Sequence, residues 1–199
     1  MLLSHEDSQL VLIDFQALLM PAMHQGSDAV NNAVRLAKCA KAFQIPVWGT
    51  EHAPEKLGAT APELASLIDQ MLVKHDFSAA EILAPVLMPV VRAPQGNARS
   101  LPKHLQKPQV AAPERCSMVL AGCEAHICLL QTALDLLEQE MEVWVVTDAC
   151  TSRTERNRDA AFDRLAGNGA ELVTTEMVLF EWLKTSQHPN HKLVQSLIA

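Results

Sequence analysis

Apolar and polar positions along the chain follow two periods, one typical of buried strands and one typical of helices. Short apolar runs predict strands at residues 9–15, 45–51, 73–77, 116–122, 142–149 and 170–176. Longer segments with apolar residues at helical spacing predict helices at residues 29–43, 63–72, 126–139, 154–169, 176–184 and 191–199. Strands and helices therefore alternate along the chain.

The predicted strands are apolar on both faces, which is typical of a parallel sheet covered by helices on each side. The pattern predicts a single α/β domain over residues 1–199, with three α/β/α layers and a doubly wound, mostly parallel sheet. Residues 84–113 are rich in proline and predict a long surface excursion. In such sheets, ligands bind beyond the carboxyl ends of the strands, so functional residues are expected there.

Composition and charge narrow the classes of function. The net charge of −7 and the scarcity of aromatic residues argue against nucleic acid as a partner. The chain has no run of about 18 uncharged apolar residues, which argues against a membrane span, and its start lacks the pattern of a signal peptide. Five cysteines, an odd number with no CxxC pair, favour a reduced, cytoplasmic protein.

Two charged residues near predicted strand ends are candidates for chemistry. Asp14 follows the first apolar strand, where an unpaired carboxylate would be costly, so it either caps a neighbouring turn or takes part in function. An ion pair with Lys74 would relieve that cost, although a lone lysine is more commonly a solvated surface residue. Spacing alone does not bring these two residues together.

The stretch LAGCEAHICLLQTALDLL carries two cysteines that compete for a chemical role. Cys128 lies at the amino end of a mostly buried helix that begins near His126, where unpaired N–H groups and the helix dipole would stabilise a thiolate. Cys123 lies in the preceding turn, further from the dipole. The remaining cysteines fit the commoner role of small buried hydrophobes: Cys39, Cys116 and Cys150. Position therefore favours Cys128 as a nucleophile.

Three of these segments, VLIDFQ, KHDFS and GCEAHIC, together resemble the signature of the isochorismatase-like cysteine hydrolase superfamily. Further segments are similar to its isochorismatase-domain-containing subgroup: TEHAPEKLGATAPEL, EAHICLLQTALDLL, VVTDACTSR and HPNHKLVQSLI. The resemblance covers nearly the whole chain apart from the proline-rich excursion. It implies a Rossmann-like fold, a small-molecule substrate, no cofactor, and a homo-oligomer that is a dimer or larger.

The resemblance also implies a catalytic triad of Asp14, Lys74 and Cys128. Asp14 would take the thiol proton, and Lys74 would hold the carboxylate and the thiolate in register. Cys128 would attack a carbonyl carbon and form a thioester that water then cleaves. The family pattern further implies a cis peptide between Cys123 and Glu124, and an oxyanion hole made by the backbone N–H groups of Glu124 and Cys128.

The residues near this triad form a candidate substrate pocket: Phe15, Gln16, His52, Phe77, Cys123 and His126. The chain departs from the family at Ala125 and His126, where Thr-Asp is frequent, so His126 either points into solvent or reaches a neighbouring subunit's site. Nicotinamidases carry an aspartate and two histidines as a metal site beyond the second strand. Here only Glu51 and His52 stand there, so we expect no metal site, which argues against nicotinamide as the substrate.

Three functions are compatible with the sequence. The first is a metal-independent cysteine hydrolase that cleaves a small amide or a related C–N bond. The second is a catalytically weak binding or scaffold member of the same fold, for which the proline-rich excursion would serve as an interaction surface. The third is a redox-sensing thiol, with Cys123 resolving a sulfenic acid on Cys128, but it leaves Asp14 and Lys74 without a role.

Overall fold

A parallel sheet forms the centre of the computed structural model, which describes residues 2–87 and 115–199. Its strand order is β3-β2-β1-β4-β5-β6, and every neighbouring pair is parallel. The strands are β1 (Ser8–Ile13), β2 (Val47–His52), β3 (Gln70–Lys74), β4 (Ser117–Cys123), β5 (Glu142–Thr151) and β6 (Glu171–Val173). The predicted α/β class with a doubly wound parallel sheet is confirmed.

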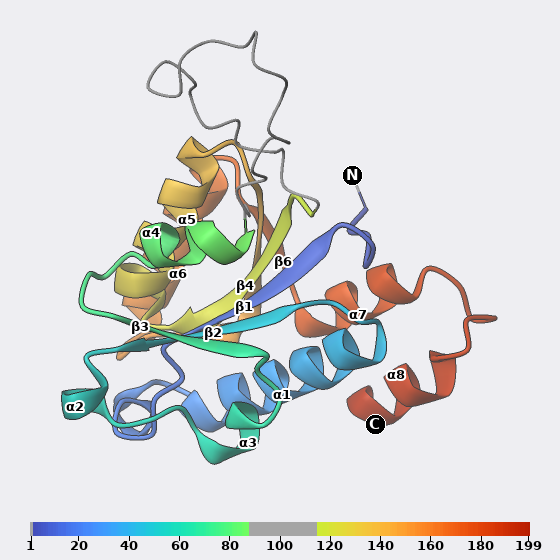
Figure 1. The fold of residues 1–199 in the computed structure, drawn as a ribbon, viewed down its shortest axis with the longest axis horizontal. Helices are drawn as coiled ribbons and strands as arrows, with labels where there is room; N and C mark the ends of the chain where they lie inside the picture. Colours follow the sequence, from blue (N-terminus) through green and yellow to red (C-terminus); the bar gives the residue numbers. More distant parts are fainter. Residues whose placement is uncertain (1, 88–114) are drawn as a thin grey trace, which may run out of the picture.

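Helices cover both faces of the sheet (Figure 1). One face carries α1 (Gly26–Ala42), α3 (Pro62–Ala65), α7 (Thr175–Leu183) and α8 (His191–Ile198). The other carries α4 (Ala80–Leu87), α5 (Leu130–Glu138) and α6 (Glu155–Gly167). Three short elements lie at or near the carboxyl edge of the sheet: η1 (Met20–Ala22), α2 (Pro54–Leu57) and the π-helical turn η3 (Ala125–Leu129).

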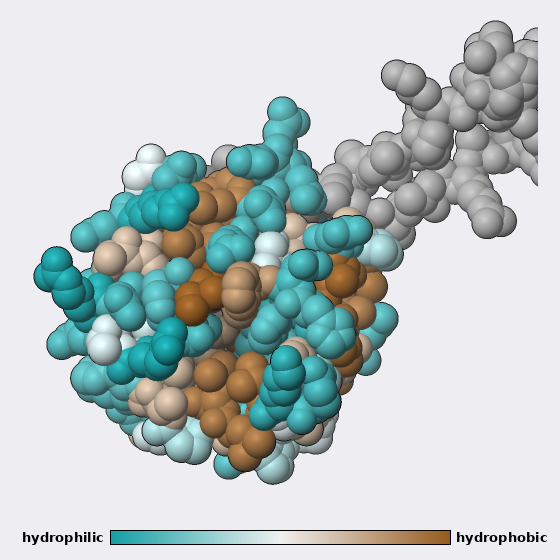
Figure 2. Space-filling view, turned by 90° about the vertical axis from the view of Figure 1, so that its left-hand side faces the viewer, coloured by the Kyte–Doolittle hydropathy of each residue, from teal (hydrophilic) through white to brown (hydrophobic). Residues whose placement is uncertain are grey.

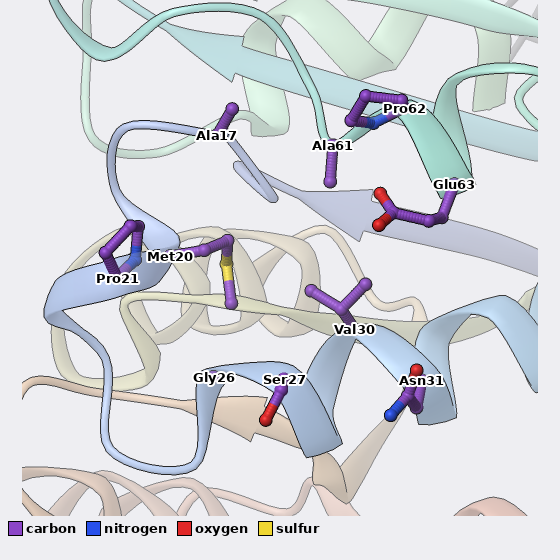
Figure 3. Close-up of a pocket in the computed structure, with 10 residues that line it drawn as sticks. All are labelled: Ala17, Met20, Pro21, Gly26, Ser27, Val30, Asn31, Ala61, Pro62 and Glu63. Carbon is purple, nitrogen blue, oxygen red and sulfur yellow. The ribbon is translucent and has the colours of Figure 1, made fainter.

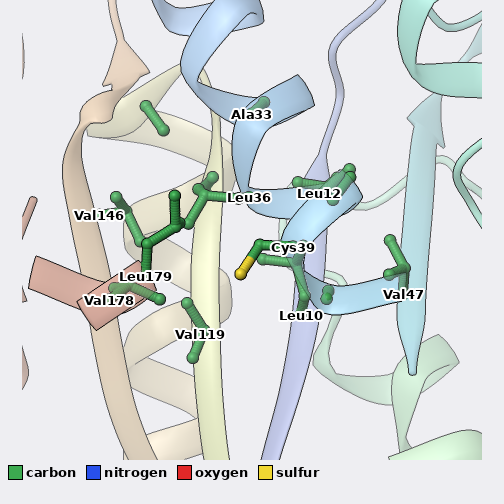
Figure 4. Close-up of a cluster of buried hydrophobic side chains, with 14 of the residues drawn as sticks. Leu10, Leu12, Ala33, Leu36, Cys39, Val47, Val119, Val146, Val178 and Leu179 are labelled. Carbon is green, nitrogen blue, oxygen red and sulfur yellow. The ribbon is translucent and has the colours of Figure 1, made fainter. Parts of the chain in front are cut away.

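Strand β1 explains why the sheet is apolar on both sides. Successive side chains of a strand point to opposite faces, so Leu10 and Leu12 pack under α1, while Val11 and Ile13 pack against the opposite layer. Figure 4 shows Leu10 and Leu12 of β1 near Cys39 of α1. All four β1 side chains are buried, and burial of such a side chain contributes roughly 1.5–3 kcal/mol.

The helix predicted at residues 63–72 is wrong. Helix α3 ends at Ala65, and residues Gln70–Lys74 form β3, which pairs with β2 along its whole length. The short apolar run around Met71 fits a strand as well as a helix, and the backbone of β2 decides between them. As a consequence β3 ends at Lys74, three residues before the predicted end of this strand.

Two further boundaries differ from the prediction. The helix expected at residues 126–139 begins with the five-residue turn η3 before α5 starts at Leu130. Residues 84–87 of the predicted proline-rich excursion belong to α4, with Pro85 inside the helix, and the remainder of the excursion lies outside the described residues. Among the helices that the structure describes, none has the length and apolar character that crossing a membrane requires.

Candidate active site

Three residues near the ends of three different strands lie at the carboxyl edge of the sheet. Asp14 directly follows β1, Lys74 is the last residue of β3, and Cys128 lies in η3 after β4. Lys74 reaches past β2 to contact Asp14. The strand order reverses between β1 and β4, and such a switch point is where open α/β sheets bind ligands. Figure 2 looks onto this edge and shows apolar side chains gathered among polar ones.

The carboxylate of Asp14 is held by the neighbouring strand β2. The backbone of Asp14 has φ +54°, a left-handed conformation in which aspartate is enriched relative to most residues. Its N–H donates to the carbonyl oxygen of Thr50 over 3.1 Å, and its Oδ1 accepts from the Thr50 hydroxyl over 2.8 Å. The side chain is fully buried, so these bonds fix where the carboxylate points.

The ammonium group of Lys74 completes the ion pair. Its Nζ lies 2.8 Å from Oδ2 of Asp14. It also donates to the carbonyl oxygens of Phe77, over 2.9 Å, and Asp76, over 3.2 Å. The side chain is 1% exposed, and the alternative of a solvated surface lysine is therefore excluded.

The charges of Asp14 and Lys74 both act on the Cys128 thiol. Burial raises the pKa of the Cys128 thiol to about 12, the negative charge of Asp14 adds to this rise, and Lys74 opposes it. A helix amino end was expected to lower this pKa. The direction is opposite because desolvation of a buried thiolate outweighs the nearby positive groups. The thiol is therefore protonated at neutral pH.

The turn after β4 brings Cys128 next to the end of β1. Gly122 pairs with Ile13, and a Cβ atom on Gly122 would lie only 2.5 Å from the Ile13 carbonyl oxygen, so this close approach requires glycine. The peptide bond between Cys123 and Glu124 is cis. The N–H of Leu129 then donates to the Glu124 carbonyl over 3.3 Å, which is the i→i−5 bond of a π turn.

The family model for the isochorismatase domain matches residues 8–177. The chain belongs to the isochorismatase family. Isochorismatase domain-containing protein 2 of Danio rerio is 36% identical over 197 residues, which cover 99% of this chain and 89% of that protein.

Solved structures of other isochorismatase-like proteins share the fold. The MAR1 ribonuclease from Caenorhabditis elegans has a TM-score of 0.80 and 28% identity, over 100% of this chain and 92% of that one. The YcaC gene product of Escherichia coli, an octameric hydrolase of unknown specificity, has a TM-score of 0.79 and 22% identity, over 99% and 89% of the two chains. The second similarity concerns the fold alone.

Phe15 and Gln16, two of the predicted pocket residues of this isochorismatase-family chain, are held by contacts within the protein. Phe15 is buried in the core on the α1 side of the sheet. The Gln16 amide nitrogen donates to the carbonyl oxygens of His52, over 3.1 Å, and Gly58, over 2.6 Å, and its oxygen accepts from the His52 N–H over 2.8 Å. Gln16 therefore ties the loop after β1 to the end of β2.

His52 and Phe77 lie next to the ion pair. Their rings stack with centroids 5.4 Å apart and an interplanar angle of 29°. His52 pairs in register with Lys74, and the Phe77 carbonyl accepts from the Lys74 ammonium. Half of Phe77 is exposed, and among the described residues His52 Nδ1 has no hydrogen-bond partner. The exposed part of the Phe77 ring is therefore the accessible part of this pair.

Cys123, at the end of β4, and Cys128, in η3, lie on opposite sides of the sheet. Cys123 belongs to the core on the α1 side, where its Sγ lies 3.4 Å from Sδ of Met20. Burial raises the pKa of its thiol well above the ordinary value. Cys128 belongs to the core on the α5 side. This separation provides no support for Cys123 as a resolving thiol.

His126 contacts its own chain and is only partly exposed. Its Nδ1 lies 3.0 Å from the Ser152 hydroxyl, and its Nε2 lies 3.4 Å from the amide nitrogen of Asn157. Burial lowers the pKa of its imidazole. Nearby, Glu124 forms an ion pair of 2.6 Å with Arg153. The alternative of a solvent-directed His126 is wrong, because both ring nitrogens face polar groups of this subunit.

The carboxylate expected near a family metal site has another partner. Glu51 Oε1 accepts from the N–H of Thr60 over 2.7 Å and from its hydroxyl over 2.8 Å. Across residues 2–87 and 115–199, no three histidine, cysteine, aspartate or glutamate side chains are grouped so that they could hold a metal ion. Glu51 thus supports the loop that precedes α3.

A cavity of about 400 Å³ lies beside the candidate active site, between η1, the start of α1 and the start of α3. Figure 3 shows the side chains of Met20, Val30 and Glu63 around this space. Its lining includes none of Asp14, Lys74 and Cys128.

Sequence reasoning missed two threonines that form hydrogen bonds with Asp14 and Cys128. Thr50 binds Asp14, and Thr132 donates from its hydroxyl to the Cys128 carbonyl over 2.7 Å. Both side chains are buried. No pattern in the sequence marks them, since threonine is common in strands and is tolerated in helices. Their partners appear only when the strand ends are brought together.

Proposed function

We propose that this isochorismatase-family protein is a metal-independent cysteine hydrolase that cleaves a small amide or a related C–N bond. One observation carries the proposal. Asp14 and Lys74 form a buried ion pair, 2.8 Å apart, and both of its charges act on the Cys128 thiol. A base, a cation and a nucleophile in mutual contact are what thiol-dependent hydrolysis requires. Membership of the isochorismatase family supports a hydrolase.

In this proposal Asp14 acts as a general base for a protonated thiol. Because the pKa of Cys128 is about 12, the proton passes to the Asp14 carboxylate as Sγ attacks the carbonyl carbon. The C–N bond then breaks, and the leaving nitrogen takes that proton from Asp14, which leaves a thioester on Cys128. Water attacks the thioester and gives its proton to Asp14. The acid product departs, and the proton returns to the Cys128 sulfur.

The proposed oxyanion hole consists of the N–H groups of Glu124 and Cys128. Both belong to the turn where β4 passes into η3, and N–H groups in the first turn of a helix lack partners within it. Cys128 precedes Leu129, whose N–H makes the i→i−5 bond of this turn. Donors so placed stabilise the negative charge that develops on the carbonyl oxygen of the substrate.

The surroundings of the triad favour a small uncharged substrate. Asp14 and Lys74 neutralise one another, and at the rim Glu124 is paired with Arg153. The half-exposed Phe77, stacked on His52, offers an apolar surface that suits the body of a small amide.

A second candidate function is a binding or scaffold protein with little turnover. The high pKa and low exposure of Cys128 favour this second function, since both lower the reactivity of the thiol. The C. elegans relative by fold carries the name of a ribonuclease, but the net charge of −7 in this chain disfavours binding of RNA phosphates.

Two further properties belong to the proposal. The octameric state of the E. coli neighbour supports a homo-oligomer. The odd number of cysteines, five with no CxxC pair, supports a reducing location such as the cytoplasm.

Hydrolysis of a panel of small amides, with an RNA oligonucleotide as a further arm, tests the function. We compare the wild type with Cys128→Ala and with the matched control Cys116→Ala, which removes a partly buried thiol elsewhere. We expect Cys128→Ala to lose at least about 10³-fold in kcat and Cys116→Ala to keep it. An acid-quenched reaction should carry the acyl group on the Cys128 peptide by mass. Turnover that survives Cys128→Ala contradicts the mechanism, and no turnover on any substrate favours the binding function.

A further inference from the structure

The hydroxyl of Thr132 joins two parts of the proposed site. Thr132 is a fully buried residue in the first turn of α5. Its hydroxyl donates to the Cys128 carbonyl over 2.7 Å and accepts from the Ala79 N–H over 2.9 Å. The first bond is ordinary, because threonine in a helix often bonds the carbonyl four residues back. The second bond is unusual, since it joins residues 53 positions apart inside the protein.

Ala79 belongs to the segment that holds Lys74. Two residues earlier, the Phe77 carbonyl accepts from the Lys74 ammonium over 2.9 Å. Ala79 immediately precedes α4, and its carbonyl accepts from the N–H of Leu83 over 3.0 Å. Two hydrogen bonds of Thr132 therefore connect the Cys128 carbonyl to Ala79. The backbone between Ala79 and Phe77 continues this connection to the carbonyl that accepts from Lys74.

We propose that Thr132 is a positioning residue that sets the placement of Lys74 relative to Cys128. The inference rests on the proposed function of the triad. A hydroxyl has one proton, and because Ala79 donates to it, that proton is directed at the Cys128 carbonyl. Without the hydroxyl, the buried Ala79 N–H has no partner, and its segment shifts to find one. Lys74 moves with this segment, whereas Asp14 stays in place because it is held by Thr50.

Alkylation by iodoacetamide tests this placement without knowledge of the substrate. The rate at Cys128 is followed by peptide mass mapping from about pH 7 to about pH 10.5, a range in which thiolate formation governs reactivity. The variants are Thr132→Val, which keeps the shape without the hydroxyl, and Thr132→Ser, which keeps the hydroxyl. Thr147→Val is the matched control, because it also removes a hydroxyl that donates to a backbone carbonyl, that of Val173.

We expect Thr132→Val to lower the rate at Cys128 about tenfold or more at a given pH. Its profile should move to higher pH, because Asp14 and Lys74 are the charged groups that act on this thiol and Lys74 is the one that lowers its pKa. Thr132→Ser should stay within about threefold of the wild type, and Thr147→Val should match it. A merely structural role would lower the melting temperature of Thr132→Val and leave the profile unchanged.

A folded Thr132→Val whose profile overlays that of the wild type overturns the inference. If this variant does not fold, Ala79→Pro gives the same reading from the other partner, since it removes the N–H donor at a position before α4 where proline is tolerated. An unchanged profile in folded Ala79→Pro overturns the inference as well. The proposed function fails separately, through turnover that survives Cys128→Ala, so the two failures are distinguishable.

Discussion

Two lysine–aspartate pairs of this protein differ mainly in burial. The Lys74 and Asp14 side chains are 1% and 0% exposed, whereas those of Lys41 and Asp69 are 38% and 41% exposed. The first pair lies at the carboxyl edge of the sheet. The second joins α1 to the segment before β3, where Asp69 also accepts from the Val47 N–H over 2.9 Å. The two pairs contain the same chemical groups and differ in their exposure to solvent.

The effect of each pair on titration reflects this difference. Burial acts to raise the pKa of Asp69, but hydrogen bonds from Lys41 and the Val47 N–H outweigh it, and the pKa is lowered. At the carboxyl edge, burial dominates and raises the pKa of the Cys128 thiol to about 12. At the exposed pair, the lysine lowers the pKa of its own partner. At the buried pair, Lys74 opposes the rise in the Cys128 pKa but does not outweigh burial.

The largest expected effect comes from removing one charge of the buried pair. Lys74→Met leaves Asp14 buried without a counter-charge, which should lower the free energy of unfolding by about 3–5 kcal/mol. Urea unfolding measures this loss. The double variant Asp14→Asn/Lys74→Met should regain much of it, because it leaves no isolated charge. A loss no greater than that of Lys41→Met would show that burial does not distinguish the two pairs.

A smaller effect should appear in the pH dependence of stability. The pKa of Cys128 is higher in the folded protein than in the unfolded chain, so its contribution is complete below the unfolded pKa and is lost as the pH rises toward about 12. Between about pH 8 and about pH 10, urea unfolding of the wild type should therefore lose roughly 1 kcal/mol more than that of Cys128→Ala. Equal losses in both proteins would mean that Cys128 is not desolvated.

The smallest effect is expected at the exposed pair. Lys41→Met should lower the free energy of unfolding by less than about 1 kcal/mol, and about 1 M salt should remove most of the difference. Because the pKa of Asp69 is lowered on folding, its contribution is present at neutral pH and is lost as the pH falls below about 4. Urea unfolding with and without salt measures both. A larger, salt-insensitive loss would place this pair in the same class as Lys74 and Asp14.

Much of the fold could be predicted from periodicity, whereas β3 could not. Strand β1 has an apolar run that is buried on both faces, and such a run is hard to mistake. The run around Met71 is short, and its half-exposed positions fit two patterns. Only pairing with β2 decides that this segment is a strand ending at Lys74. The same holds for the π turn, whose i→i−5 bond depends on how β4 packs against β1.

The sequence by itself determined the alternation of strands and helices, the family resemblance, and the identity of Asp14, Lys74 and Cys128 as candidates. Only the tertiary structure decided that Asp14 and Lys74 form a buried ion pair, that Thr50 and Thr132 form hydrogen bonds with Asp14 and the Cys128 carbonyl, and that burial raises the pKa of the Cys128 thiol. The physical reason is distance along the chain. Periodicity reports which face of an element is buried, but contacts between strand ends, and the desolvation they cause, arise only when the sheet assembles.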